Sequence, residues 1–243
     1  MTDNVPVIAV DGPSGVGKGT LCQALAQHLG WHLLDSGSLY RLTALAAQKH
    51  EIPLDDEARL APLAARLDVR FETLPGQETQ VLLEGGNVTA AIRSEACGNA
   101  ASRVAALPAV RAALLQRQRG FRQPPGLVAD GRDMGTVVFP DAPVKIFLTA
   151  TPTVRAIRRY KQLREKGINV SLSALAREIA ERDARDASRA VAPLRPAPDA
   201  RVVDTTELSI VAVRRQALTM LAEYLNQASP EVTGGLCSAR PDD

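Results

Sequence analysis

Residues 7–20 read Val7-Ile8-Ala9-Val10-Asp11-Gly12-Pro13-Ser14-Gly15-Val16-Gly17-Lys18-Gly19-Thr20, an apolar run that passes into a glycine-rich loop with a lysine. A helical pattern follows, with Leu21, Leu25 and Leu29 on one face and Gly30 at the place of a C-terminal glycine. The order is therefore strand, loop and helix. Glycines let successive backbone N–H groups turn toward one centre, where the helix N-terminus adds partial positive charge. We predict that this loop binds phosphate groups.

The loop departs from the standard phosphate-loop pattern at one position. That pattern has Ser or Thr directly after the lysine, as a magnesium ligand, whereas here Gly19 intervenes before Thr20. One alternative is a glycine-rich turn without a ligand, although few folds need four glycines and a lysine at a helix start. Another is a Rossmann loop, with Gly15 and Gly17 as its first glycines and Asp35 as the ribose acid. In that alignment Thr20 stands where the third glycine belongs.

Length and composition narrow the class of protein. A chain of 243 residues suits one domain, or a domain with a small insert. Hydrophobic residues at 45% and charged residues at 23% are ordinary globular proportions, which argues against disordered and fibrous classes. No run approaches 18 apolar residues, so we expect a cytoplasmic protein with no membrane partner. The three cysteines (Cys22, Cys97 and Cys237) are an odd number without CxxC spacing, which favours packing roles over disulfides or zinc.

The charge pattern bears on the partners. The net charge of +2 argues against a general nucleic-acid binder, and 3% aromatic residues leave little material for base-stacking surfaces. Only five of the 29 basic residues are lysines. Arginine's planar guanidinium suits phosphate and carboxylate recognition. Codon bias in a GC-rich genome explains the same excess equally well.

Short apolar runs alternate with longer helical patterns, as in a parallel α/β sheet. We predict strands at 7–10, 32–34, 127–129, 144–148 and 201–203, and a helix from Leu208 to about Asn226. Residues 67–91 differ, because their short apolar runs and turns predict a small antiparallel meander. Residues 228–243 lack periodicity and are expected to form a disordered tail.

Further motifs follow the loop in order along the chain. They are Asp35-Ser36-Gly37, Tyr40-Arg41, Asn99-Ala100-Ala101-Ser102, Asp130-Gly131-Arg132-Asp133-Met134-Gly135, and Arg182-Asp183-Ala184-Arg185-Asp186 with Arg189. Together with the ending Gly17-Lys18-Gly19-Thr20, they resemble the bacterial cytidylate kinases, within the nucleoside monophosphate kinases. The resemblance covers residues 5–227.

The resemblance implies an α/β phosphate-loop kinase fold, with a five-stranded parallel sheet flanked by helices, a small antiparallel insert and a short lid. It implies a single domain over 1–227. The core comprises about 5–35, 108–154 and 190–227, the nucleotide-monophosphate-binding insert about 36–107, and the lid with its following helix about 155–189.

By the same resemblance, Ser36 and Arg41 hold the phosphate of the acceptor. These residues follow a predicted strand, at the edge of the sheet where ligands gather in parallel α/β folds. The alternative is that Asp35 and Ser36 only cap the next helix, which is a common use of Asp and Ser.

The motif around Arg132 also follows a predicted strand. Asp130 has the placement of a carboxylate that binds magnesium through water. By resemblance Arg132 grips the acceptor phosphate and Asp133 reads the base, together with Ser102 and Arg111. An isolated Arg-Asp pair is more often a surface ion pair of little energetic value.

Residues 155–189 carry eight arginines and two lysines against five acidic residues. Such density is often a solvated helix face, and Arg182 and Asp186, four apart, share one face. The resemblance instead assigns Arg182 and Asp186 to the ribose hydroxyls and Arg189 to phosphate. A lid arginine near the transferring phosphoryl group is also implied, with the choice among Arg155, Arg158 and Arg159 left open.

The expected activity is ATP-dependent phosphorylation of CMP and dCMP by a monomer that binds no nucleic acid. Magnesium is expected on phosphates and waters, with no direct protein ligand and with Asp130 acting through water. A GTPase switch would need an N-K-x-D motif, which we do not find, whereas a phosphate-loop kinase for another metabolite remains open.

The catalytic candidates are Lys18, Asp130, Arg132 and Arg189. The ATP-binding candidates are Gly12, Pro13, Ser14, Gly15, Val16, Gly17, Lys18, Gly19 and Thr20. The substrate-binding candidates are Ser36, Arg41, Ser102, Arg111, Arg132, Asp133, Arg182, Asp186 and Arg189.

Overall fold

Five strands form one parallel sheet at the centre of the fold. The structure is a computed structural model, and it describes residues 5–72, 80–165 and 167–227. The strand order is β2-β6-β1-β7-β8, so the strand before the glycine-rich loop is central. All five predicted strands are confirmed. They are β1 (Val7–Asp11), β2 (His32–Asp35), β6 (Leu127–Gly131), β7 (Val144–Thr149) and β8 (Arg201–Asp204).

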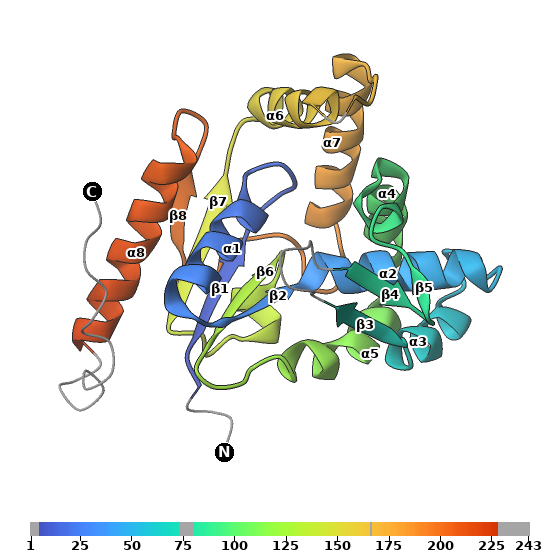
Figure 1. Cartoon of the computed structure of the whole chain (residues 1–243), viewed down its shortest axis with the longest axis horizontal. Helices are drawn as coiled ribbons and strands as arrows, with labels where there is room; N and C mark the ends of the chain where they lie inside the picture. Colours follow the sequence, from blue (N-terminus) through green and yellow to red (C-terminus); the bar gives the residue numbers. More distant parts are fainter. Residues whose placement is uncertain (1–4, 73–79, 166, 228–243) are drawn as a thin grey trace.

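Helices cover both faces of the sheet, as predicted for a doubly covered parallel sheet (Figure 1). One face carries α1 (Lys18–Leu29) and α8 (Ile210–Gln227), whose buried Leu21, Leu25 and Val213 pack with Ile8 and Ile146 of the strands. The other face carries α2 (Ser36–Lys49), α5 (Pro108–Arg119) and the π-helical turn η2 (Met134–Val138). Helix α3 (Glu57–Ala65) packs against α5 and α2.

Helix α1 ends where the sequence predicts. Gly30 has a φ of 64°, and its N–H donates to the carbonyl oxygens of Ala26 and Gln27. Helix α8 confirms the second predicted helix with its start shifted by two residues. Cys22 and Cys97 are free and buried, which fits the predicted packing role. Cys237 lies outside the described residues.

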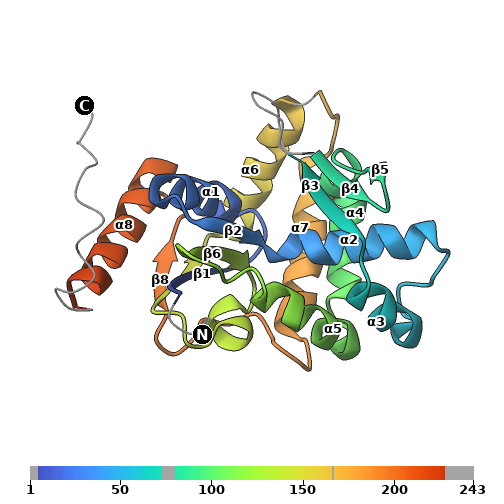
Figure 2. The ribbon, with the colours of Figure 1, turned by 60° about the horizontal axis from the view of Figure 1, so that its bottom comes forward.

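A second, antiparallel sheet forms the predicted meander. Its order is β3-β4-β5, with β3 (Val69–Glu72), β4 (Gln80–Leu83) and β5 (Gly86–Asn87). The short helix η1 (Ala91–Arg93) and α4 (Glu95–Val104) follow it. Figures 1 and 2 show this sheet and α8 at opposite ends of the molecule. Part of the turn predicted in the meander, and the predicted tail at 228–243, lie outside the described residues.

Two helices stand above the carboxyl ends of the parallel strands. They are α6 (Pro152–Glu165) and α7 (Leu172–Ala187), which pack against each other (Figure 1). They contain the arginine-rich segment that the resemblance assigns to the lid. Within the part of the chain that the structure describes, no helix is both long and apolar enough to span a membrane.

Candidate active site

The glycine-rich loop joins β1 to α1 in a shape that its glycines permit. Gly12 has a φ of 145°, and a Cβ there would stand 2.2 Å from the carbonyl oxygen of Leu148. Gly17 starts α1 from the left-handed region, with a φ of 94°. The Val16 side chain is buried in the core, so we expect this residue to face a ligand with its backbone alone.

Lys18 lies at the start of α1 beneath this loop. Its Nζ donates to the carbonyl oxygen of Pro13 at 2.9 Å and lies 3.9 Å from Oδ1 of Asp130, near the end of β6. Burial, and then the charge of Arg132, lower the pKa of Lys18 to about 8. Burial raises the pKa of Asp130 to about 6, against the opposing effect of Lys18. Lys18 and Asp130 therefore both have pKa values close to neutral pH.

This pair predicts a pH profile. We expect kcat/KM for ATP, which reports the free enzyme, to fall as pH rises through about 8, where Lys18 loses its proton. We also expect it to fall as pH drops through about 6, where Asp130 gains one. Asp130→Asn removes a charge that raises the pKa of Lys18, so the alkaline limb should move to lower pH. The nucleotides have the same pKa values in assays of the wild type and of Asp130→Asn, so a difference between the two pH profiles comes from the protein. An alkaline limb that stays in place would contradict the assignment to Lys18.

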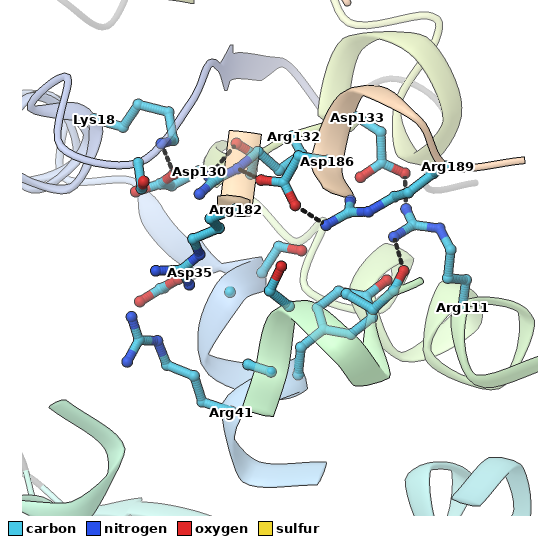
Figure 3. A pocket seen from close by; sticks show the side chains of 18 of the residues that line it. Lys18, Asp35, Arg41, Arg111, Asp130, Arg132, Asp133, Arg182, Asp186 and Arg189 are labelled. Atoms are coloured by element: carbon cyan, nitrogen blue, oxygen red, sulfur yellow. Dashed lines mark hydrogen bonds and ion pairs between the residues drawn. The ribbon is translucent and has the colours of Figure 1, made fainter. Parts of the chain in front are cut away.

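Most of the predicted site residues line one cavity of about 240 Å³ at the carboxyl ends of the parallel strands. The loop, α2, α4, α5, α7 and the segment after β6 all contribute to it (Figure 3). Of the residues predicted from the sequence, the cavity is lined by Ser14, Gly15, Lys18, Ser36, Arg41, Ser102, Arg111, Asp130, Arg132, Asp133, Arg182, Asp186 and Arg189.

The remaining loop residues lie elsewhere. Gly19 and Thr20 line a larger neighbouring groove of about 780 Å³ between α1, β2, α2 and the insert. Gly12, Pro13, Val16 and Gly17 line neither space.

Asp186 links two of the predicted phosphate-binding arginines. Its Oδ2 accepts from Nε of Arg132 at 2.9 Å, and its Oδ1 accepts from Nη2 of Arg189 (Figure 3). Burial alone would raise the pKa of Asp186, but the two guanidinium groups hold it below its ordinary value. The carboxylate therefore stays charged and fixes both arginines at the cavity.

A second buried ion pair lies at the end of the cavity formed by α5. Arg111 donates through Nη2 to Oδ2 of Asp133 and through Nη1 to the carbonyl oxygen of Ala105 at 3.1 Å. Its guanidinium also lies 5.5 Å from the centre of the Tyr40 ring. Asp133 and Arg111 are 3% and 7% exposed, so they form a buried ion pair. The surface pair considered above joined Arg132 to Asp133, whereas the structure pairs Arg132 with Asp186.

Like charges gather opposite this pair. Arg182 donates to the carbonyl oxygen of Gly98 at 2.9 Å, and Arg41 donates to that of Ile92 at 2.7 Å. Burial, and then the charges of Arg132 and Arg41, lower the pKa of Arg182 to about 10. A Cβ at Gly98 would stand 3.1 Å from Arg41 and 3.2 Å from Arg182. This glycine, which the sequence reasoning missed, lets the two cations approach. Such a cluster favours a bound anion.

Asp35 and Ser36 were considered either as caps of the next helix or as part of the binding site, and the structure divides these roles between them. Asp35 caps α2, because its Oδ1 accepts from the backbone N–H of Ser38 at 3.1 Å. Ser36 lines the cavity, and its hydroxyl donates to Oε1 of Gln118 at 2.7 Å. Gln118, buried on α5, is a second residue that the sequence reasoning missed.

Ser102 also has an unexpected partner. Its Oγ accepts from Nε of Arg185 at 3.2 Å, and the serine itself is buried at the cavity wall. Because the oxygen accepts that bond, its own hydrogen is free to donate elsewhere.

The three lid arginines have different surroundings. Arg155 is buried, with bonds to Asp183 and to the carbonyl oxygen of Ser14. Arg158 donates to both oxygens of Thr205. Arg159 lines a second cavity of about 170 Å³ together with Ser14 and Gly15, and donates through Nε to Glu95 at 2.6 Å.

The carboxylate of Asp130 fits a magnesium ion, because this ion prefers oxygen ligands. Among the described residues, no group of three His, Cys, Asp or Glu side chains could hold a metal. Asp130 is the carboxylate beside Lys18, and a Cβ at Gly19 would stand 3.6 Å from its Oδ2. Magnesium commonly keeps several waters and binds through one or two carboxylates and substrate phosphates.

Fold and site together define a class of protein. A phosphate loop with its lysine stands beside a cavity whose buried arginines suit an anion. This arrangement is that of a phosphotransferase that brings an anionic acceptor to a nucleotide donor.

Comparison with known proteins gives the family. The cytidylate kinase family model matches residues 8–223. The cytidylate kinase of Edwardsiella ictaluri (strain 93-146) is 63% identical over 225 residues, covering 93% of this chain and 100% of its own. That of Aeromonas hydrophila subsp. hydrophila is 58% identical over 229 residues, covering 94% and 99%. The chain belongs to the cytidylate kinase family, which confirms the resemblance found in its motifs.

Among solved structures, a gluconokinase from Sinorhizobium meliloti 1021 aligns with 93% of this chain and 98% of its own. Its identity of 18% and TM-score of 0.46 are low, so the family assignment rests on the sequence relatives.

Proposed function

We propose that the protein transfers the terminal phosphoryl group of ATP to CMP and dCMP, giving CDP and dCDP. The observation that carries this proposal is the charge of the cavity beside the phosphate loop. Six cationic and four acidic side chains line it, an excess of positive charge that suits a phosphorylated acceptor. Membership of the cytidylate kinase family supports cytosine as its base.

The chemistry needs little help from a general base. The attacking oxygen belongs to a phosphate whose second pKa is about 6, so it is largely deprotonated at neutral pH. Catalysis then consists of alignment and charge neutralisation. In this proposal the loop Gly12–Thr20 holds the donor phosphates, Lys18 neutralises developing charge, and Arg41, Arg132 and Arg189 hold the acceptor phosphate in line with the donor.

Magnesium is proposed as the metal, and Asp130 is the residue that would hold it, through water. When bound, the ion would neutralise negative charge on the phosphates of ATP. Asp130 keeps this capacity above its pKa of about 6.

The remaining lining residues are proposed to recognise the nucleoside. Asp133 would accept from the cytosine amino group, while Arg111 and Ser102 would donate to the ring N3 and the O2 carbonyl. The bond from Arg185 leaves the Ser102 hydroxyl hydrogen available for this purpose. Arg182 and Asp186 would bind the ribose hydroxyls.

The division into core, insert and lid remains our proposal, with the boundaries given above. Among the lid arginines we favour Arg159 as the one that meets the transferring phosphoryl group, because it shares a cavity with Ser14 and Gly15 of the loop. Closure of insert and lid would exclude water and limit ATP hydrolysis. We further propose a cytoplasmic monomer without nucleic-acid or membrane partners.

A panel of nucleoside monophosphates in an ADP-release assay tests this function. We expect rapid ADP release with CMP and dCMP, and slow release with UMP, AMP or GMP. ADP release that does not depend on any acceptor would favour a nucleotide hydrolase or switch. Faster release with an acceptor other than a cytidine nucleotide would favour a kinase for another metabolite. Either outcome would overturn the proposal.

A further inference from the structure

Asp11 joins two loops that lie far apart in the sequence. It is the last residue of β1, directly before the phosphate loop. Its Oδ1 accepts from the backbone N–H of Met134 and its Oδ2 from that of Gly135, each at 2.8 Å. Both donors directly follow Arg132 and Asp133 in the chain. We call these two hydrogen bonds the Asp11 bridge.

We propose that Asp11 is a positioning residue that holds Arg132 and Asp133 in register with the phosphate loop. This inference rests on the proposed function, because it assigns to Asp11 the alignment of acceptor against donor. Asp11 itself touches neither nucleotide in this proposal and acts through the backbone after Asp133.

The strand pairing explains why the bridge has this effect. β1 and β6 pair in parallel up to Asp11 and Gly131, where both strands end. Arg132 and Asp133 come next, and the bridge then holds Met134 and Gly135. The two site residues thus form a two-residue segment that is fixed at both ends, by the strand pairing before it and by the bridge after it.

The local backbone makes an acceptor necessary here. Met134 and Gly135 begin the π-helical turn η2, and the first N–H groups of a helical turn have no partner within it. A carboxylate offers an acceptor oxygen to each of two neighbouring amides.

The surroundings of Asp11 distinguish it from an ordinary surface carboxylate. The residue is 5% exposed, and burial raises its pKa to about 6 even though both amide bonds oppose that shift. The charges of Asp133 and Lys18 also act on the pKa of Asp11. A buried carboxylate is costly to maintain, and its two bonds go to the segment that carries Arg132 and Asp133.

Asp11→Asn tests the inference with nearly unchanged shape. The amide keeps one acceptor oxygen but turns an NH₂ donor toward one of the two N–H groups, so one bond of the bridge is lost. We expect kcat/KM for CMP to fall roughly 10- to 100-fold, since small misplacements of positioning groups have effects of this size. The ratio of kcat/KM for CMP to that for UMP should narrow several-fold, while KM for ATP changes less than about two-fold.

Val10→Ala is the matched control. Val10 is fully buried on the same strand, one residue before Asp11, so its truncation loosens the strand and lowers the melting temperature without removing the carboxylate. We expect this variant to keep the wild-type CMP to UMP ratio. That ratio does not depend on the fraction of folded enzyme, so it separates positioning from stability. If Asp11→Asn gives too little soluble protein, Asp11→Ser is measured in the same way.

The outcomes distinguish this inference from the proposed function. A wild-type enzyme that does not phosphorylate CMP overturns the function, and the inference with it. A wild-type enzyme that does so, with an unchanged CMP to UMP ratio in Asp11→Asn, overturns the inference alone. An equal narrowing of the CMP to UMP ratio in Val10→Ala overturns it as well. So does a rise in KM for ATP well beyond about two-fold in Asp11→Asn.

Discussion

Replacement of Lys18 by alanine is expected to lower kcat by roughly two to three orders of magnitude, by analogy with the removal of one preorganised stabiliser of transition-state charge. The side chain is 7% exposed and lies between the loop and the cavity, so water cannot easily replace its charge. Its loss also removes the cation that lowers the pKa of Asp130. That carboxylate should then take up a proton closer to neutral pH, which weakens its hold on magnesium.

Lys49→Ala provides the control for this measurement. Lys49 also pairs with a carboxylate, Glu84, at 2.6 Å, but its side chain is 52% exposed and lies outside the cavity. We expect near wild-type kcat for this variant and an unchanged circular dichroism spectrum for both. Near-normal turnover by a folded Lys18→Ala variant would show that the lysine does not act on the transferred charge.

The sequence predicts the architecture well because its main signals are local. Each parallel strand is an apolar run that ends at a polar or glycine residue, and α1 carries its leucines on one face between Gly17 and Gly30. The order of strands in the sheet is not local information. The central position of β1 between β6 and β7 depends on pairings across more than a hundred residues, and no periodicity contains them.

The same distinction separates the predicted site residues from those that were missed. Motifs that follow strands converge because the carboxyl ends of parallel strands share one edge of the sheet, and this brings Lys18 and Asp130 together. The partners of those residues depend instead on how helices are rotated against each other. Gln118, on α5, accepts a hydrogen bond from Ser36. Gly98, on α4, leaves space for the side chain of Arg182, on α7. Neither pattern has a recognisable signal in a single sequence.

The spacing of residues on one helix face does not predict all the ion pairs of α7. Arg182 and Asp186 are four residues apart on α7 and both line the cavity. The hydrogen bonds of Asp186, however, go to Arg189, three residues away, and to Arg132 after β6. Arg182 donates to a carbonyl oxygen of α4. Arginines of the cavity therefore belong to a network that spans three segments of the chain, and an i,i+4 rule describes only pairs within one helix.

Selectivity for cytosine over uracil is expected to be at least ~10² in kcat/KM, because a site with buried polar groups rejects an analogue that leaves them unpaired. Cytosine carries an amino group where uracil carries a carbonyl oxygen. Against the Asp133 carboxylate, the amino group forms a hydrogen bond and the carbonyl oxygen faces another acceptor.

Asp133→Asn is expected to narrow this CMP to UMP ratio markedly, and the structure indicates which way the new amide turns. Arg111 has only donors and already bonds Oδ2 of Asp133, so the amide oxygen should keep that place and the NH₂ should face the base. It would then donate to the uracil carbonyl and oppose the cytosine amino group. Asp141→Asn is the control, since it alters an Arg-Asp pair with Arg122 in which the Asp141 side chain is 55% exposed, and it should leave the ratio unchanged. The measurement is kcat/KM for both nucleotides in all three enzymes. An identical ratio in the wild type and Asp133→Asn would mean that Asp133 does not read the base.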